Sequence, residues 1–592
     1  ISYSISTKKG KIDFALPKSF VSDEKKLGDL AIDLEEAIIN KDKNLAYKLI
    51  SSLIKKEELT KKIIEKIKTF IENLIFLEIK NWNRIWVRII ISFLKIFNLG
   101  KFDFIVGNPP WIDWKALPDG YRNNIKELCL EKHIFSGDKF TGGINLNICA
   151  LISSVASNNW LKHEGIFAFL MPKSLSFQSS YSGFRNLKQD DGVDLKYLKI
   201  VDWSKSGNPF FPVTEKFCTY YFIKSKFKQL NSIPVIKIKL KKGFSIKEKK
   251  LPINIIEKFF ETKKIDGFIN TGPFNHFTFA ENKKFIPVMK ALSGNSDYKG
   301  RVGLGIYPKE ILLFKLIKKQ RNILVLENFQ GKATERKSYK KKIILENTFV
   351  HPVIEGPNIK SFGLSDIDYY SALPYTDKDL KKPIPLKELK KVSPKLAKYY
   401  LDNQKYLVKT DYNQRVQGKK GEFYSLTRVG KYTFANFRVV YRNNTSWEAC
   451  VISGKYLLLD HACSISQDNN GNYLTLEEAH YICAILNSKI VKNYMENSSD
   501  LRSIKTDLII RLIKYDPKFW VHKMLSKVSK KLHTKVKNKD LYYNFLNYLI
   551  IRYVNELKPG NKKNNFDLKL ENALNNINGI DEDLILEKYK FN

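Results

Sequence analysis

The apolar positions between residues 22 and 99 recur every three or four residues, which is the spacing of amphipathic helices. Leu30, Leu34 and Ile38 fall on one face of such a helix, and the polar stretch 40–44 separates it from the next apolar set. The pattern predicts two or three helices in this region.

After residue 100 the pattern changes, and short apolar runs alternate with longer amphipathic segments. The runs predict strands at 102–106, 165–171, 195–203 and 218–223, and helices are expected at 121–131 and 145–159. This alternation predicts an α/β domain with a mostly parallel, doubly wound sheet. Ligands of such sheets bind at the carboxyl ends of the strands.

The first of these strands runs through Gly107 into Asn108-Pro109-Pro110-Trp111. The two prolines stiffen the loop and remove two N–H donors, so the carbonyl of Pro109 is left to accept from a ligand. An aromatic amine would donate one hydrogen to this carbonyl and one to the Asn108 side chain, which favours a nucleophilic nitrogen. Trp111 offers a flat face for a planar base. An ordinary turn is the alternative, because Asn-Pro is a frequent turn signal.

A second aromatic loop, Asn208-Pro-Phe-Phe-Pro212, lies between the last two predicted strands. A base flipped out of a duplex needs an apolar wall on each side. Phe210 or Phe211 fits as the second wall for base stacking, opposite Trp111. For either phenylalanine, packing in the core is the alternative.

The stretch from Phe102 to Trp111 resembles motif IV of the S-adenosylmethionine-dependent N6-adenine DNA methyltransferases, in particular the large restriction-modification methylases similar to Eco57I. Residues 145–151, 165–174 and 209–221 resemble motifs V, VI and VIII of these enzymes. The resemblance implies a Rossmann-like methyltransferase sheet, S-adenosyl-L-methionine as cofactor and a flipped adenine as substrate. The catalytic residues that it implies are Asn108, Pro109, Pro110 and Trp111, with a cofactor contact at Asn145, where many relatives carry Asp.

A complete enzyme of this kind also needs a glycine-rich turn and a following acidic residue to hold its cofactor. No such turn precedes Asn108, and the Gly-x-x-Gly-x-Gly segment at 300–305 opens the DNA-recognition region in the resembled family. We therefore expect a partial sheet. The remaining cofactor residues are expected outside this chain, upstream of Ile1 or on an upstream-encoded subunit.

The charge of the chain favours a polyanionic partner. In the 592 residues, 102 Lys and Arg stand against 61 Asp and Glu, a formal net charge of +41. Such an excess favours double-stranded DNA through counterion release. A biased overall composition is the alternative explanation.

Basic and aromatic residues interleave between residues 300 and 516, as contacts to phosphates and base edges require. The region resembles the target-recognition domain of the Eco57I-like methylases. The expected DNA contacts are Arg415, Lys419, Lys420, Arg428, Arg438 and Arg442. For each of them, a surface charge over a β core is the alternative.

The chain is accordingly expected to consist of five segments. These are a helical segment (1–100), the C-terminal part of a catalytic core (101–235), a charged linker (236–295), a mixed α+β target-recognition domain (296–516) and a helical region (517–592).

Several other chemistries lack their residues. Cytosine C5 methylation normally uses a Pro-Cys dipeptide and zinc deamination an HxE with a PCxxC, and neither pattern occurs. The six scattered cysteines are expected to be reduced core residues of a cytoplasmic protein, with no metal site. The apolar stretch from Ile85 to Leu99 contains Arg88 and Lys95 and is too short to span a membrane.

The sequence thus predicts a site-specific DNA adenine-N6 methyltransferase component of a restriction-modification or phage-defence system. Two alternatives stay open: a non-catalytic DNA-binding specificity subunit, and an amino-methyltransferase that acts on RNA adenine or protein glutamine.

Overall fold

The computed structural model describes residues 2–7, 10–15, 24–54, 56–79, 100–135, 146–207, 214–245, 256–270, 275–281, 283–330, 341–376, 380, 382–408, 422–442, 444, 446–499, 508–556 and 569. The chain forms two compact units. Unit 1 comprises residues 1–172, 186–203 and 217–230, and unit 2 comprises residues 173–185, 204–216 and 231–592.

Unit 1 begins with a β-hairpin and three helices. The elements are β1 (Ser2–Thr7), β2 (Gly10–Ala15), α1 (Glu24–Ile39), α2 (Lys43–Ser52) and α3 (Lys61–Ile79). The helices confirm the helical pattern, and Leu34, Ile50 and Phe70 are at most 2% exposed in one apolar cluster. The apolar stretch 85–99 lies outside the described residues.

The sheet strands of unit 1 are neighbours in the order β3-β4-β6-β5. They are β3 (Phe102–Gly107), β4 (Leu161–Pro172), β5 (Leu195–Lys205) and β6 (Phe217–Lys224). β3 and β4 are parallel, whereas β6 is antiparallel to both β4 and β5. The prediction of a mostly parallel sheet is therefore wrong here, and the sheet is mixed. The connection between β5 and β6 is too short for the helical crossover that a parallel pair needs.

In the described part of the chain, the helices α5 (Asp119–Glu131) and α6 (Cys149–Trp160) accompany these strands. They overlap the predicted helices at 121–131 and 145–159, with bounds that differ by up to four residues. α6 leads directly into β4, so the order β3, α6, β4 forms a β-α-β unit with parallel strands.

β3 is the terminal strand of this order in the part of the chain that the structure describes. Its apolar side chains face outward: Phe104 is 68% exposed and Val106 is 79% exposed. An apolar run of this kind is typical of a strand buried on both faces, and the structure differs because, among the described residues, β3 pairs with β4 alone.

Unit 2 contains an antiparallel set of strands followed by a short helix. The elements are β7 (Ile233–Leu240), α7 (Ile256–Phe259), β8 (Phe260–Ile269), β9 (Phe277–Ala280) and α8 (Ile286–Leu292). These elements occupy the segment that the sequence predicts as a charged linker. Helix α14 (Lys489–Ser498) contacts β9 through a hydrogen bond between Thr278 and Ser498 of 2.7 Å.

The rest of unit 2 is built on two larger sheets. The first has the order β10-β21-β18-β19, with β10 (Tyr298–Val302), β18 (Phe437–Arg442), β19 (Ala449–Ser453) and β21 (Ala462–Asp468). The second has the order β13-β12-β11-β17-β14-β20, with β11 (Phe314–Lys319), β12 (Ile323–Asn328), β13 (Lys342–Glu346), β14 (Val350–Ile354), β17 (Tyr369–Ala372) and β20 (Leu457–Leu458). A two-stranded ribbon is formed by β15 (Ile359–Lys360) and β16 (Gly363–Leu364).

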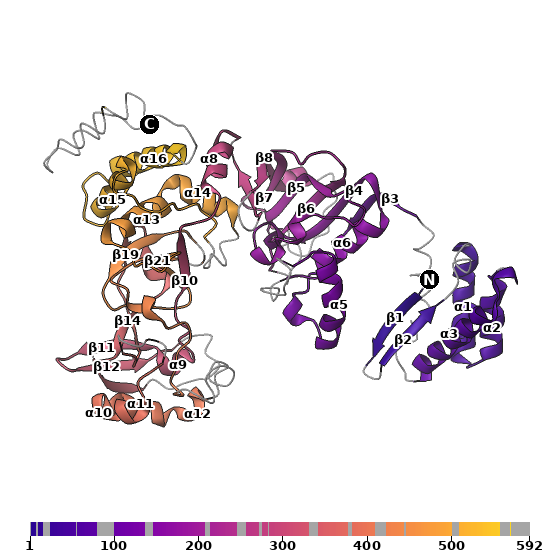
Figure 1. The fold of residues 1–592 in the computed structure, drawn as a ribbon, viewed down its shortest axis with the longest axis horizontal. Coiled ribbons are helices and arrows are strands. Elements are labelled where there is room, and N and C mark those ends of the chain that lie inside the picture. The colour runs from indigo at the N-terminus through magenta and orange to yellow at the C-terminus, as the bar shows by residue number, and fades with distance from the viewer. Residues whose placement is uncertain are drawn as a thin grey trace. The chain divides into compact units, whose positions relative to one another are not determined.

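Helices cover both sheets (Figure 1). Near the second sheet lie α9 (Lys309–Leu312), α10 (Leu386–Val392), α11 (Pro394–Asp402) and α12 (Gln404–Leu407). Near the first lie α13 (Leu476–Asn487), α14, α15 (Trp520–Leu532) and α16 (Lys539–Glu556). α13 is the central helix of the larger core, because every residue from Glu478 to Asn487 is buried.

None of the helices in the described residues combines the length and the apolar character that crossing a bilayer requires.

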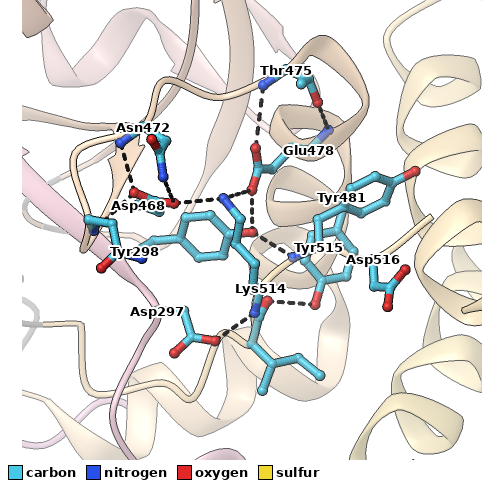
Figure 2. A network of polar contacts seen from close by, with 12 residues as sticks. Asp297, Tyr298, Asp468, Asn472, Thr475, Glu478, Tyr481, Lys514, Tyr515 and Asp516 are labelled. Carbon is cyan, nitrogen blue, oxygen red and sulfur yellow. Dashed lines mark hydrogen bonds and ion pairs between the residues drawn. The ribbon is translucent and has the colours of Figure 1, made fainter. Parts of the chain in front are cut away.

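A buried polar network ties the segment after α14 to the first sheet (Figure 2). The ammonium group of Lys514 lies 2.9 Å from the carboxylate of Asp468 and 2.7 Å from that of Glu478, and both carboxylates are nearly inaccessible to solvent. The Tyr298 hydroxyl donates to Glu478 at 2.8 Å and accepts from the backbone N–H of Tyr515 at 2.8 Å. Since buried carboxylates need a paired charge, Lys514 holds its segment in place.

We expect Lys514→Met to destabilise the packing of residues 508–516 by about 2 kcal/mol. Removal of one partner from a buried pair costs roughly 3–5 kcal/mol, and solvent reduces this because the Lys514 side chain is 47% exposed. Hydrogen exchange of residues 508–516 at neutral pH measures the change. Lys518→Met, at a neighbouring exposed lysine, is the control and should leave the exchange rates as they are.

The same network predicts acid sensitivity. Burial alone would raise the pKa of Asp468, but the hydrogen bonds from Lys514 and Asn472 lower it to about 2. An unfolded Asp has a pKa of roughly 3.9, so Asp468 stabilises the fold above about pH 4, and this contribution is lost as the pH falls toward 2. In Lys514→Met the loss should begin at higher pH. An unchanged acid limb in an unfolding titration would contradict this account.

Candidate active site

The Asn108 loop begins at the end of β3, where the backbone is packed tightly against β4. Gly107 pairs with Phe169, and a Cβ at Gly107 would lie 2.9 Å from the Phe169 ring. This contact explains why glycine ends the strand. Beyond it, Pro109 is buried while Asn108 is exposed, so the asparagine side chain is presented to solvent from a fixed backbone.

Trp111 is half-buried, and the edge of its indole ring that carries the nitrogen is fixed by a hydrogen bond. Its indole Nε1–H donates to the carbonyl of Leu170 at 3.1 Å, and its ring lies 5.7 Å from that of Phe217, at an interplanar angle of 37°. Because Leu170 belongs to β4 and Phe217 begins β6, two strands fix the orientation of this side chain.

The chain after Trp111 is joined to the segment that leads into α6. The N–H of Ile148 donates to the carbonyl of Ile112 at 2.9 Å, and the N–H of Trp114 donates to the carbonyl of Leu146 at 2.7 Å. Asn147, 4% exposed, lies between these bonds and accepts from the N–H of Cys149 at 3.2 Å through its side chain. The Asn108 loop is therefore closed on its C-terminal side by the start of α6.

The carboxyl end of β4 lies at the same edge of the sheet, because β4 is parallel to β3. The Tyr220 hydroxyl donates to the carbonyl of Pro172, the last residue of β4, at 3.3 Å. Polar groups thus gather at the carboxyl ends of two neighbouring parallel strands, where ligands of α/β sheets bind.

The surroundings of this loop do not offer a nucleophilic thiol. Burial raises the pKa of Cys149, so its thiol stays protonated, and all six cysteines are free and buried. Within the described ranges no group of three or more His, Cys, Asp or Glu side chains could hold a metal ion. The chemistry available at the loop is hydrogen-bond acceptance and aromatic contact.

Several residues predicted from the sequence lie outside the described residues, and their roles stay predictions. These are Phe210, Phe211, Asn145, Arg415, Lys419 and Lys420.

The three remaining arginines fall into different environments. Arg428 is exposed. Arg438 is 1% exposed and donates to the carbonyls of Thr433, Gly454 and Tyr456, so we correct its assignment from DNA contact to core.

The side chain of Arg442 is 15% exposed, and its guanidinium bonds the carbonyl of Ile359 and the carboxylate of Glu448, each at 2.9 Å. It too is held by the protein, but it is not fully buried, and its contact with DNA stays a prediction.

Two residues of the site were missed by sequence reasoning. Phe217 contacts Trp111, and Asn147 closes the loop. The apolar alternation of residues 217–224 could have placed Phe217 on a strand face, but its pairing with Trp111 depends on the position of β6 next to β4.

Comparison with known proteins gives matches to modification enzymes. Residues 22–210 match the family model described as Eco57I restriction-modification methylase. Over 103 residues the chain is 35% identical to the modification methylase CviBIII of Paramecium bursaria Chlorella virus NC1A. This match spans 17% of the chain and only 22% of that relative.

Solved structures of restriction-modification enzymes are loosely similar. The type IIL enzyme MmeI in complex with DNA matches with a TM-score of 0.45 and 10% identity, over 93% of this chain and 77% of the other. A nuclease-deletion mutant of the type ISP enzyme LlaGI, with a DNA substrate mimic, matches with a TM-score of 0.38 and 12% identity, over 88% and 44%.

We expect Asn147→Ala to loosen the Asn108 loop, because the buried N–H of Cys149 would lose its acceptor. The loss of about 1 kcal/mol should speed hydrogen exchange across residues 146–149 roughly fivefold. Mass spectrometry of the exchanged peptides measures this. Asn123→Ala, an exposed position on α5, is the matched control. Equal exchange in both variants would argue against a closing role for Asn147.

Proposed function

Residues 22–210 place this chain in the Eco57I restriction-modification methylase family, and on this premise we propose that it methylates the N6 amine of adenine at specific sites in double-stranded DNA. The observation that carries the proposal is the Asn108 loop. It presents an exposed amide beside the buried Pro109 and the anchored Trp111, at the carboxyl ends of parallel strands.

The loop would act by orienting the amine. The Asn108 side-chain oxygen accepts one hydrogen of the amine, and the carbonyl of Pro109 accepts the other. The nitrogen then becomes more tetrahedral, and its lone pair is less delocalised into the ring and more nucleophilic. These acceptors gain strength as positive charge develops on the nitrogen, and therefore they favour the transition state over the bound base. Pro110 keeps the loop rigid and contributes no competing N–H.

Trp111 would hold the flipped base by stacking, which contributes about 1–3 kcal/mol per base. The hydrogen bond to Leu170 and the contact with Phe217 fix the indole before the base arrives, so little side-chain entropy is lost on binding. Phe210 or Phe211 is proposed as the opposite wall.

S-adenosyl-L-methionine is the methyl donor that the family implies. The described residues do not form a glycine-rich cradle for it: a Cβ at Gly303 would lie 2.3 Å from the carbonyl of Leu459, and one at Gly305 would lie 2.2 Å from the Thr427 hydroxyl. These glycines serve packing within unit 2. We assign no described residue to the donor, and propose that its site is formed by Asn145 with residues outside this chain.

A cofactor-binding part outside this chain would have a place to bind in this proposal. β3 exposes Phe104 and Val106 directly before Asn108, and a further parallel strand there would bury both side chains. A cofactor-binding subunit or an upstream part of the same protein would then carry the donor to the amine.

The second candidate is a non-catalytic DNA-binding specificity subunit, which the lack of a described glycine cradle favours. Transfer to RNA adenine or protein glutamine is the third. These alternatives differ in which acceptor, if any, receives the methyl group.

The test uses the full chain, radiolabelled S-adenosyl-L-methionine and three acceptors: duplex DNA, RNA and protein, with and without the product of the upstream gene. Label in DNA alone supports the proposal, and label only with the upstream product supports a split enzyme. DNA binding without label in either mixture would establish the specificity subunit instead.

We expect Asn108→Ala to lower the rate of transfer about 100-fold or more while DNA affinity changes little, because its acceptor acts mainly in the transition state. Single-turnover rates and a DNA titration measure the two effects. Asn123→Ala serves as the control. A normal rate of methyl transfer in Asn108→Ala would show that Asn108 does not orient the amine.

A further inference from the structure

Arg428 adopts a backbone conformation that few residues other than glycine tolerate. Its φ is +63°, in the left-handed region. The Tyr432 hydroxyl donates to the carbonyl of Arg428 at 2.8 Å, and Arg428 Nη1 donates to the carbonyl of Gly303 at 3.3 Å. Both ends of this exposed residue are thus fixed, at a cost in backbone strain that is typical of functional sites.

The segment 303–305 packs tightly beside Arg428. A Cβ at Gly305 would lie 2.2 Å from the hydroxyl of Thr427, the residue before Arg428. Since Arg301 is the second residue before Gly303, this close approach brings the two arginines to the same part of unit 2.

Arg301 is fixed by the same tyrosine. Its guanidinium lies 4.2 Å from the centroid of the Tyr432 ring, and its Nη2 donates to the Gln467 side chain at 3.4 Å. Burial raises the pKa of Tyr432, and the charges of Arg301 and Arg428 oppose this. Tyr432 thus contacts Arg301 through its ring and Arg428 through its hydroxyl, which bonds the backbone carbonyl of Arg428.

The two guanidinium groups keep most of their donors. Each has a single hydrogen bond to another described residue, whereas a guanidinium carries five N–H groups. Arg438 and Arg442 differ, because each donates to several groups of the protein, among them carbonyls and the carboxylate of Glu448. Arg301 and Arg428 are positioned by the protein, yet they keep N–H groups that can donate to a ligand.

We propose that Arg301 and Arg428 together bind one backbone phosphate of the DNA duplex, with Tyr432 as the support that holds both. The inference rests on the proposed function for its ligand, DNA. Two neighbouring guanidinium groups repel each other, and a shared anion relieves this repulsion, whereas a guanine edge accepts from one guanidinium. The contact would set the register of unit 2 on the duplex without reading its sequence.

The test compares Arg301→Ala, Arg428→Gly and the double variant with the wild-type chain. The probe is a pool of duplexes with a randomised central segment, and affinity is measured over a range of salt concentrations. Each single variant should bind about tenfold more weakly on every duplex, with a salt slope smaller by about 1. Because both side chains share one phosphate, the double variant should lose much less than the product of the single losses.

Folding is controlled in two ways. Glycine adopts φ of +63° without strain, so Arg428→Gly should melt no lower than the wild type despite its weaker binding. Arg321→Ala changes an exposed arginine on the turn between β11 and β12, and should leave affinity unchanged.

Three outcomes would overturn the inference while the wild type binds DNA. These are unchanged affinity in the single variants, losses that multiply in the double variant, and losses confined to particular duplex sequences, which would mean base reading. If the wild-type chain does not bind duplex DNA at all, the proposed function fails as well.

Discussion

The parallel pairing of β3 with β4 is the constraint on which the site depends. The register sets Gly107 against Phe169, and this contact leaves no room for a side chain at the point where the strand ends. The Asn108 loop therefore starts at a fixed height above the sheet, and the carbonyl of Leu170, one residue further along β4, is in place to anchor Trp111. A shift of the register by one residue would turn Phe169 to the other face and separate the tryptophan from its acceptor.

Much of this loop could be read from the sequence, because an apolar run followed by glycine and two prolines restricts the backbone locally. The helices of the N-terminal segment were also predictable, since their period of 3.6 residues is a local property. The antiparallel insertion of β6 between β4 and β5 was not, because periodicity reports that a strand exists and not which strand it pairs with. For the same reason the contact of Phe217 with Trp111 was missed.

The arginines of unit 2 show a second limit of sequence reasoning. Arg428, Arg438 and Arg442 stand in the same kind of basic and aromatic pattern, yet one is exposed and two are held by the protein. The difference arises from the direction of each side chain on its strand or turn. β18 places Arg438 toward the carbonyls of two turns, which form only when the chain has folded. Whether a charge at such a position is buried depends on tertiary contacts, and the local composition of the sequence does not predict it.

The exposed edge of β3 can promote self-association of the protein. In the part of the chain that the structure describes, β3 pairs with β4 alone, so its other edge, beside Phe104 and Val106, is a template on which an extended apolar segment can add as a new strand. Two copies of this chain can satisfy that edge by pairing with each other, at the position where the amine-orienting loop begins. Self-association at high concentration would then cover the approach to Asn108, and the apparent activity per molecule would depend on how dilute the protein is.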